Sequence, residues 1–166
     1  MIHNSLLPEI TVPETLLTPF ILQHAQRLSN EPALVEGSTG RTLTYAEFAE
    51  QVKALAGGLQ QRGFGEGDVL AIMAPNVPEY AVAFHGTAWA GSTVTTVNPT
   101  YTADEVKHQL KDSGAKLLVT VSMFLSVAQD AIQGTEVEEI FTIDASDVAS
   151  LASLYGEPLE NQVEVS

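Results

Sequence analysis

The sequence predicts an α/β fold: an open, mainly parallel sheet with helices on both faces, built from repeated βα units. One observation behind this prediction is the nearly unbroken apolar run from Asp68 to Ala74, which is typical of a strand covered on both faces. Another is that helical periodicity alternates with short β-branched runs up to Thr120, with Asn, Pro or Gly at each junction. Strands joined by helices of this length run parallel, with right-handed crossovers.

Composition and charge narrow the possible functions. The chain has 166 residues, 45% of them hydrophobic, which suits one domain or a large piece of one. It has no cysteine, which excludes disulfides, thiolate metal sites and cysteine catalysis. No apolar run reaches membrane-spanning length and no secretory signal begins the chain, so we expect a cytoplasmic protein. A formal charge of −14 disfavours binding to nucleic acid or to anionic membranes.

The first part of the chain leads into a helix and a small β-hairpin. Residues 1–17 contain two prolines and little periodicity, which predicts an extended lead-in. Thr18 and Pro19 have the character of an N-cap and a first helical residue, with the helix ending before Pro32. The segments 33–36 and 41–44 then flank Gly-Ser-Thr-Gly, which predicts a hairpin. This tetrapeptide superficially resembles a phosphate loop, but no lysine follows it in the required place.

A capping box formed by Thr44 and Glu47 predicts the next helix. Its apolar stripe indicates a helix face in the core: Tyr45, Phe48, Val52, Leu55 and Leu59. The glycines at 63, 65 and 67 follow a helix and precede a strand, the reverse of the order in a dinucleotide-binding loop. They therefore predict a helix stop and a turn.

The predicted βαβαβ unit begins with the strand at 68–74. Asn76 is the expected N-cap of the following helix, with Glu79 at its third position and Gly91 at its end. Residues 92–97 form the second predicted strand. A capping box of Thr102 and Glu105 then opens a helix that stops at Gly114, and residues 116–120 form the third strand.

Two further elements and a tail complete the chain. Ser122 is the expected cap of a helix that ends at Gly134, and residues 138–144 form a fourth parallel strand. A short helix is expected within 144–156, through Val148, Leu151 and Leu154. Residues 157–166 form a polar tail without periodicity.

The chain carries no familiar enzyme motif of the G-x-S-x-G, H-E-x-x-H or G-x-x-x-x-G-K-[ST] type. His24 has no second ligand at metal spacing, His85 is expected to be a structural histidine, and His108 shares a charged surface with Lys111. The acidic residues Glu136, Glu138, Glu139, Asp144 and Asp147 are expected on the surface. The seven cations are scattered along the chain: Arg27, Arg41, Lys53, Arg62, Lys107, Lys111 and Lys116.

The loops beyond the carboxyl ends of the strands are the expected place for a ligand, because open α/β sheets bind ligands there. These loops contain Pro75 and Asn76, residues 98–101, Ser122 and Asp144. None of them is glycine-rich or basic.

Several blocks, in order and in register, resemble the amino-terminal region of the adenylate-forming acyl-CoA synthetases. The blocks are Leu43-Thr-Tyr-Ala-Glu-Phe48, Gly65-Glu-Gly-Asp-Val69, Ala74-Pro-Asn-Val-Pro-Glu-Tyr80, Ala83-Phe84 with Gly86 and Ala90-Gly91, Val97-Asn-Pro99 with Tyr101-Thr102, and Ser113-Gly-Ala-Lys-Leu117. The resemblance extends over about residues 15 to 155. It is most like the 4-coumarate–CoA ligase branch, with medium-chain fatty acyl ligases close behind.

The resemblance implies a ligase that works in two steps. ATP, with Mg²⁺, would activate a carboxylic acid as acyl-adenylate with release of pyrophosphate, and CoA would then displace AMP. Residues 18–156 would be the amino-terminal α/β subdomain of the large adenylation domain. The family's phosphate loop, ribose-binding aspartate and catalytic lysine lie downstream of the matched region. No catalytic, cofactor-binding or metal-binding residue is therefore assigned, and the chain is expected to be an inactive amino-terminal fragment of a longer ligase.

One other class of function stays open, and a third is disfavoured. The chain could be a non-catalytic interaction module derived from this family, using an unfinished sheet edge or a missing partner face. The same exposed surface would favour self-association. A free-standing nucleotide-binding domain is disfavoured because no glycine-rich loop follows a strand.

Overall fold

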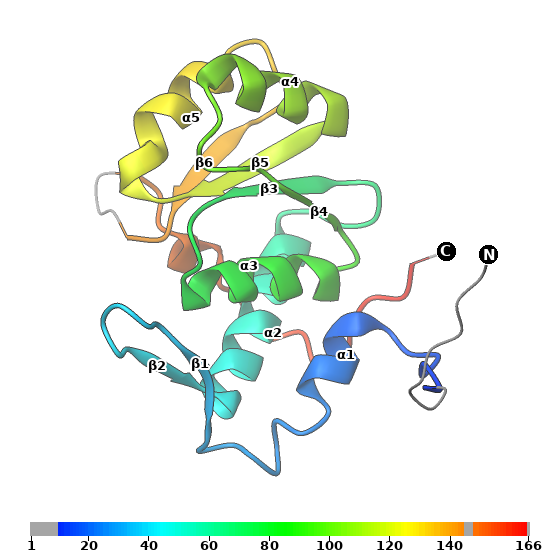
Figure 1. The fold of residues 1–166 in the computed structure, drawn as a ribbon. Helices are drawn as coiled ribbons and strands as arrows, with labels where there is room; N and C mark the ends of the chain where they lie inside the picture. Colours follow the sequence, from blue (N-terminus) through cyan, green and yellow to red (C-terminus); the bar gives the residue numbers. More distant parts are fainter. Residues whose placement is uncertain (1–9, 145–147, 166) are drawn as a thin grey trace, which may run out of the picture.

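The computed structural model describes residues 10–144 and 148–165, and it confirms the predicted α/β class (Figure 1). Four parallel strands form one sheet in the order β4-β3-β5-β6. These strands are β3 (Val69–Met73), β4 (Thr93–Thr96), β5 (Ala115–Thr120) and β6 (Glu139–Thr142). The helices are α1 (Leu17–Leu22), α2 (Tyr45–Gln61), α3 (Pro78–Trp89), α4 (Ala103–Ser113) and α5 (Leu125–Ala131), with 3₁₀ turns η1 (Ser122–Phe124) and η2 (Leu151–Leu154).

Two helical layers cover the sheet. Helices α4 and α5 lie on one face, and α2 and α3 lie on the other (Figure 1). Each face has its own cluster of buried side chains. Val106 and Leu110 of α4 pack with Leu118 on one side, whereas Leu55 of α2 packs with Val82 of α3 on the other. The central strands β3 and β5 are therefore covered on both faces, as their continuous apolar sequences predict.

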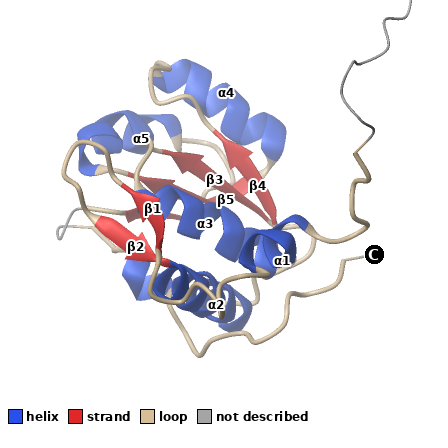
Figure 2. Cartoon of the chain, turned by 60° about the horizontal axis from the view of Figure 1, so that its bottom comes forward, coloured by secondary structure: helices blue, strands red, loops and turns tan. Residues whose placement is uncertain are grey.

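The predicted hairpin is present as a separate antiparallel pair, β1 (Pro32–Val35) and β2 (Thr42–Thr44). It lies beside α2 and α3, outside the main sheet (Figure 2). The guanidinium of Arg41 donates hydrogen bonds to both carboxylate oxygens of Glu79 at the start of α3, one of them 2.8 Å long. Arg41 also bonds Glu36 of the hairpin, so a single cation fastens the hairpin to α3.

Both predicted capping boxes are confirmed. Thr44 accepts the backbone N–H of Glu47 while the Glu47 carboxylate accepts the backbone N–H of Thr44, and Thr102 and Glu105 do the same for α4. Helix α4 ends at Gly114, which has φ 64° and ψ 32° and so adopts the left-handed conformation that favours glycine. Within residues 10–144 and 148–165, no helix is long and apolar enough to cross a membrane.

Three predicted N-caps are wrong, two because the side chain has a tertiary partner instead and one because a proline sets a later helix start. Thr18 lies inside α1, where it is buried and hydrogen-bonded to His85. Helix α3 has Pro78 at its first position, so its N-cap is Val77 rather than Asn76. Glu79 consequently occupies the second helical position and bonds Arg41. Ser122 belongs to a 3₁₀ turn, and its hydroxyl donates to Asp144.

Two predicted helices are shorter in the structure. Helix α1 ends at Leu22, because the N–H of Ala25 donates to the Leu22 carbonyl in a tighter turn that begins the irregular segment before β1. The helix expected within 144–156 is reduced to the 3₁₀ turn η2. Part of that predicted helix, and Asp147 of the acidic group, lie outside the described residues.

Candidate functional site

The carboxyl edge of the sheet is the candidate site. In the order β4-β3-β5-β6 the chain first moves from β3 to β4 on one side and then crosses to β5 on the other. The loops after β3 and β5 therefore leave the sheet at a topological switch point, where open α/β sheets bind ligands. The segments expected there, at Pro75, Asn98, Ser122 and Asp144, all follow the carboxyl ends of strands.

A groove of about 500 Å³ lies at the ends of β3 and β4. It brings together two of the predicted loop segments, which are 22 or more residues apart in the sequence. Its lining residues are Ala74, Pro75, Asn76, Tyr80, Thr96, Val97, Asn98 and Pro99. Tyr80 and Thr96 line this groove although the sequence alone did not single them out. Their signal was positional only, since Tyr80 lies in the first turn of α3 and Thr96 is the last residue of β4.

Two polar side chains of this groove, those of Asn98 and Tyr80, already have hydrogen-bond partners within the protein. The Oδ1 atom of Asn98 accepts hydrogen bonds from the backbone N–H of Thr100 at 3.0 Å and from its hydroxyl at 2.9 Å, which closes the loop after β4. Burial raises the pKa of the Tyr80 phenol, against the opposing effect of a hydrogen bond with Thr96. Tyr80 is therefore a neutral hydrogen-bonding group near neutral pH rather than a proton acceptor.

The other half of the edge is closed by the protein itself. The backbone N–H and the hydroxyl of Ser122 donate to the two carboxylate oxygens of Asp144, at 2.7 and 2.8 Å. These contacts tie the loop after β5 to the loop after β6. The Asp144 carboxylate is therefore paired within the protein. Asp144 is also exposed, as expected for the acidic group.

No Lys or Arg lines the groove at the carboxyl edge within the described part of the chain. Four of the cations pair with carboxylates elsewhere: Arg41 with Glu79, Lys53 with Glu160, Arg62 with Glu139 and Lys116 with Asp68. The Lys116 ammonium, 2.5 Å from the Asp68 carboxylate, lowers the pKa of Asp68 at the opposite, amino edge of the sheet, together with the Gly65 N–H. The groove can offer shape and neutral hydrogen bonds, but it offers no cationic side chain for a phosphate.

The histidines of the described residues do not form a metal site. His85 is half-buried, its Nδ1 is 2.9 Å from the Thr18 hydroxyl, and burial lowers the pKa of its imidazole. This agrees with the structural role expected for it. His108 is exposed on α4 beside acidic side chains. Among residues 10–144 and 148–165, no cluster of His, Asp or Glu is arranged to hold a metal ion.

Comparison with known proteins places the fold and its sequence blocks in one family. The AMP-binding enzyme family matches residues 21–165, which is most of the chain. The chain belongs to the AMP-binding enzyme family. It is 38% identical over 125 residues to 4-coumarate–CoA ligase 3 of Arabidopsis thaliana and 37% identical over 145 residues to 4-coumarate–CoA ligase 1 of Narcissus pseudonarcissus. These matches cover 75% and 86% of this chain.

Solved structures agree with this family. A long-chain-fatty-acid–CoA ligase from Archaeoglobus fulgidus superposes with a TM-score of 0.84 at 25% identity, covering 95% of this chain. A fatty acyl CoA synthetase of Mycobacterium tuberculosis superposes at 0.73 with 28% identity over 90% of the chain. The chain spans only part of its relatives: 22% and 26% of the two plant ligases, and 33% of the archaeal ligase.

Proposed function

We propose that these 166 residues form the amino-terminal part of an ATP-dependent carboxylic acid–CoA ligase of the 4-coumarate–CoA ligase type. The observation that carries this proposal is the family match over residues 21–165, together with plant 4-coumarate–CoA ligases at 31–38% identity. The reaction would join a carboxylic acid to CoA through an acyl-adenylate, with ATP as the energy source. We place the complete enzyme in the cytoplasm, in agreement with a chain that has no cysteine.

The described residues do not themselves fit ATP or Mg²⁺. A nucleotide triphosphate requires converging backbone N–H groups and a cation, and Mg²⁺ requires free oxygen ligands. The groove at the carboxyl edge has no cation, and the oxygen of Asn98 already accepts two hydrogen bonds. The contribution proposed for this chain is therefore architectural: it supplies one wall at the carboxyl edge of a larger adenylation domain.

The isolated chain is expected neither to hydrolyse ATP nor to bind it tightly. Titration calorimetry of the 166-residue protein with Mg-ATP measures this directly. A dissociation constant in the micromolar range would contradict the architectural role. It would require a phosphate site that the groove at the carboxyl edge does not offer.

A second candidate function differs from the first only in the carboxylic acid that the enzyme would use. The superposition with a fatty-acid ligase at a TM-score of 0.84 favours a medium- or long-chain fatty acid as the alternative to an aromatic acid. Acid-dependent exchange between ATP and pyrophosphate distinguishes them when a polypeptide that continues beyond residue 166 is assayed with both classes of acid. Exchange with hydroxycinnamic acids supports the first proposal, and exchange with fatty acids supports the second. If no acid supports exchange, the non-catalytic interaction module is favoured instead, and self-association becomes the property to measure.

A further inference from the structure

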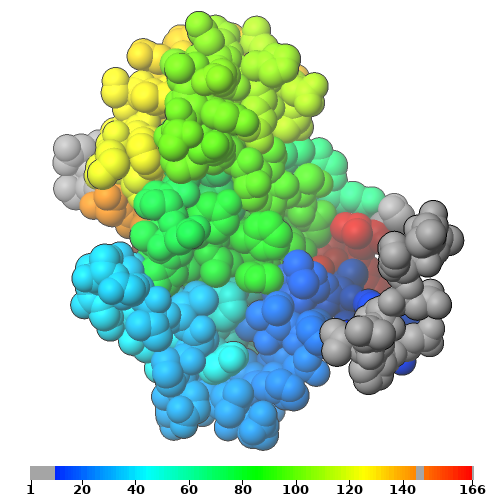
Figure 3. Space-filling view, in the orientation of Figure 1, coloured from blue at the N-terminus to red at the C-terminus, as the bar shows by residue number. Residues whose placement is uncertain are grey.

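The last described segment crosses the helical layer of α2 and α3. Residues 156–163, here called the strap, run in an extended path from η2 over α2 to the end of α3. In the space-filling view the C-terminal segment lies next to α1 and α3 (Figure 3). The strap was not expected, because its residues show neither helical nor strand periodicity.

The strap hydrogen-bonds to the middle of an intact helix. The backbone N–H of Gly156 donates to the Ala54 carbonyl at 2.9 Å, and that of Leu159 donates to the Lys53 carbonyl at 3.0 Å. In an α-helix these two carbonyls are already paired with the N–H groups of Gly58 and Gly57, four residues further on. The carbonyls accept a second donor here because the two residues that would shield them have no side chains.

The close approach is possible only for glycine. A Cβ atom at Gly57 would lie 1.8 Å from the carbonyl oxygen of Glu157, and one at Gly58 would lie 1.5 Å from that of Leu154. From the other side, a Cβ atom on Gly156 would lie 2.8 Å from the Cα atom of Gly58. Two adjacent glycines inside a helix are unfavourable for the helix by itself, so this contact accounts for their presence.

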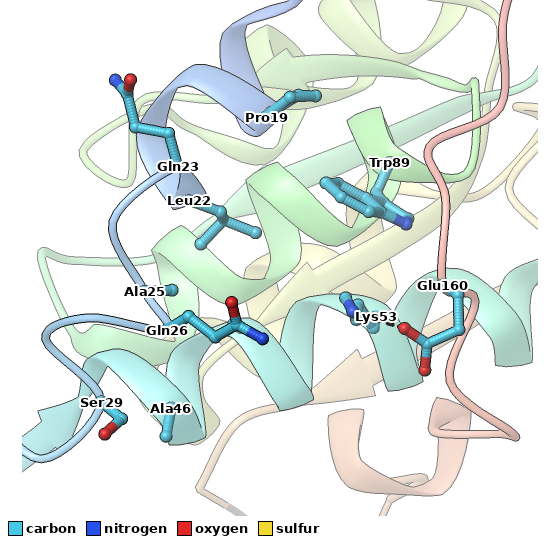
Figure 4. A pocket seen from close by; sticks show the side chains of 11 residues that line it. Pro19, Leu22, Gln23, Ala25, Gln26, Ser29, Ala46, Lys53, Trp89 and Glu160 are labelled. Atoms are coloured by element: carbon cyan, nitrogen blue, oxygen red, sulfur yellow. Dashed lines mark hydrogen bonds and ion pairs between the residues drawn. The ribbon is translucent and has the colours of Figure 1, made fainter.

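The strap also covers the tryptophan at the end of α3. The indole Nε1 of Trp89 donates to the Leu159 carbonyl at 2.8 Å, and the Trp89 carbonyl accepts the Val163 N–H at 2.9 Å. Glu160 of the strap pairs with Lys53 of α2 at 2.7 Å. Trp89, Lys53 and Glu160 lie on one side of a groove of about 660 Å³ beneath α1 (Figure 4). Its other side carries Pro19, Leu22 and Gln23.

The strap is held less firmly than the core. Every residue from 156 to 163 is half-buried or exposed, whereas β3 and β5 are almost entirely buried. Its contacts include main-chain hydrogen bonds, one indole bond, one surface ion pair and the partly buried side chain of Leu159, which packs against the core of the α2–α3 face. A segment with few buried apolar contacts opens at a lower free energy than the core.

We propose that Gly57 and Gly58 form a docking site on α2 for extended main chain, that the strap occupies it reversibly, and that the docked strap closes one side of the groove beneath α1. The inference is independent of the ligase activity proposed above. It predicts a native state with a minor open form in which Trp89 and the groove are exposed while the sheet stays folded.

The test uses Gly57→Ala in the complete chain, with Gly37→Ala as the matched control. Gly37 lies in the hairpin turn, without a positive φ, and a Cβ atom there meets nothing within 4 Å. In Gly57→Ala we expect the emission of Trp89, the chain's one tryptophan, to shift to longer wavelength and its quenching by acrylamide to rise. Amides of Gly156, Leu159 and Val163 should exchange at least about tenfold faster, with β3 and β5 still protected. The control should change neither.

A change on the strap itself keeps the test decisive if Gly57→Ala fails to fold. Gly156→Ala leaves the sequence of α2 intact and should release the strap in the same way. The double variant should show less than the sum of the two single effects, because a released strap cannot be released again. The proposal is overturned if Gly57→Ala raises Tm and leaves Trp89 unchanged, as an ordinary helix glycine would. It is also overturned if strap release removes the protection of β3 and β5.

Discussion

The two faces of the sheet are assembled in different ways. The face covered by α4 and α5 consists of consecutive elements, since α4 joins β4 to β5 and α5 joins β5 to β6. The opposite face gathers α1, the hairpin, α2, α3 and the strap from distant parts of the chain; Lys53 and Glu160, for example, form an ion pair across 107 positions. The first face depends on helix caps and apolar spacing, whereas the second depends on close approaches and single polar contacts between distant segments.

This difference explains where the glycines of the second face lie. At Gly86 of α3 a Cβ atom would lie 2.7 Å from the side chain of Leu55, so the glycine allows α2 and α3 to approach closely. Gly57 and Gly58 likewise allow the strap to approach α2 closely. In consecutive βα units, the short connections already bring each helix onto the sheet. Segments from distant parts of the chain pack together only where their contact surfaces fit closely, as they do at these glycines.

The largest expected effect comes from removing one buried leucine on each face. Leu55→Ala and Leu110→Ala each delete a fully buried side chain, and each should lower the free energy of unfolding by about 2–5 kcal/mol. Leu55→Ala should also speed amide exchange in α1 and the hairpin, because these elements pack on the α2–α3 pair. Urea unfolding and amide exchange measure both effects. If Leu110→Ala speeds amide exchange in α1 and the hairpin as much as Leu55→Ala does, the stabilities of the two faces are coupled and the comparison fails.

An intermediate effect is expected at the two capping boxes, where the two faces should behave alike. Thr44→Ala in α2 and Thr102→Ala in α4 each remove a hydroxyl that accepts the N–H of the third helical residue. Each should cost about 1 kcal/mol of stability, since the interaction is local in both helices. Thr→Ser replacements, which keep the hydroxyl, serve as controls. A clearly larger loss at Thr44 would mean that tertiary packing on its face depends on the cap.

The smallest effect is a pH dependence confined to the α2–α3 face. Burial lowers the pKa of His85 below its ordinary value of 6.5 in the folded state. The unfolded chain therefore binds the proton more readily, so this contribution to stability is complete above pH 6.5 and is lost as the pH falls toward the folded pKa. His85→Asn, which keeps a polar atom near Thr18, should flatten the decline in Tm between neutral and mildly acidic pH. His108→Asn on the exposed surface of α4 is the matched control, and an equal flattening there would contradict the assignment to His85.

Most elements of the sheet and of the α4–α5 face could be predicted from the sequence. The Thr102–Glu105 box, the stop at Gly114 and the apolar strand at 69–73 all depend on residues within a few positions of one another. The positions of the candidate loops followed as well, because parallel strands place their carboxyl ends at one edge. What could not be predicted was the use of their side chains, such as Ser122 bonding Asp144 rather than capping a helix.

By itself, then, the sequence determined the fold class, the parallel strands and the family to which the chain belongs, because periodicity, caps and in-register blocks are readable along the chain. The tertiary structure alone decided that Thr18 bonds His85, that Arg41 fastens the hairpin to Glu79, and that an aperiodic tail lies across α2. The physical reason is distance along the chain. Backbone geometry fixes what residues three or four apart can do, but a polar side chain has many possible distant partners until packing brings one of them within reach.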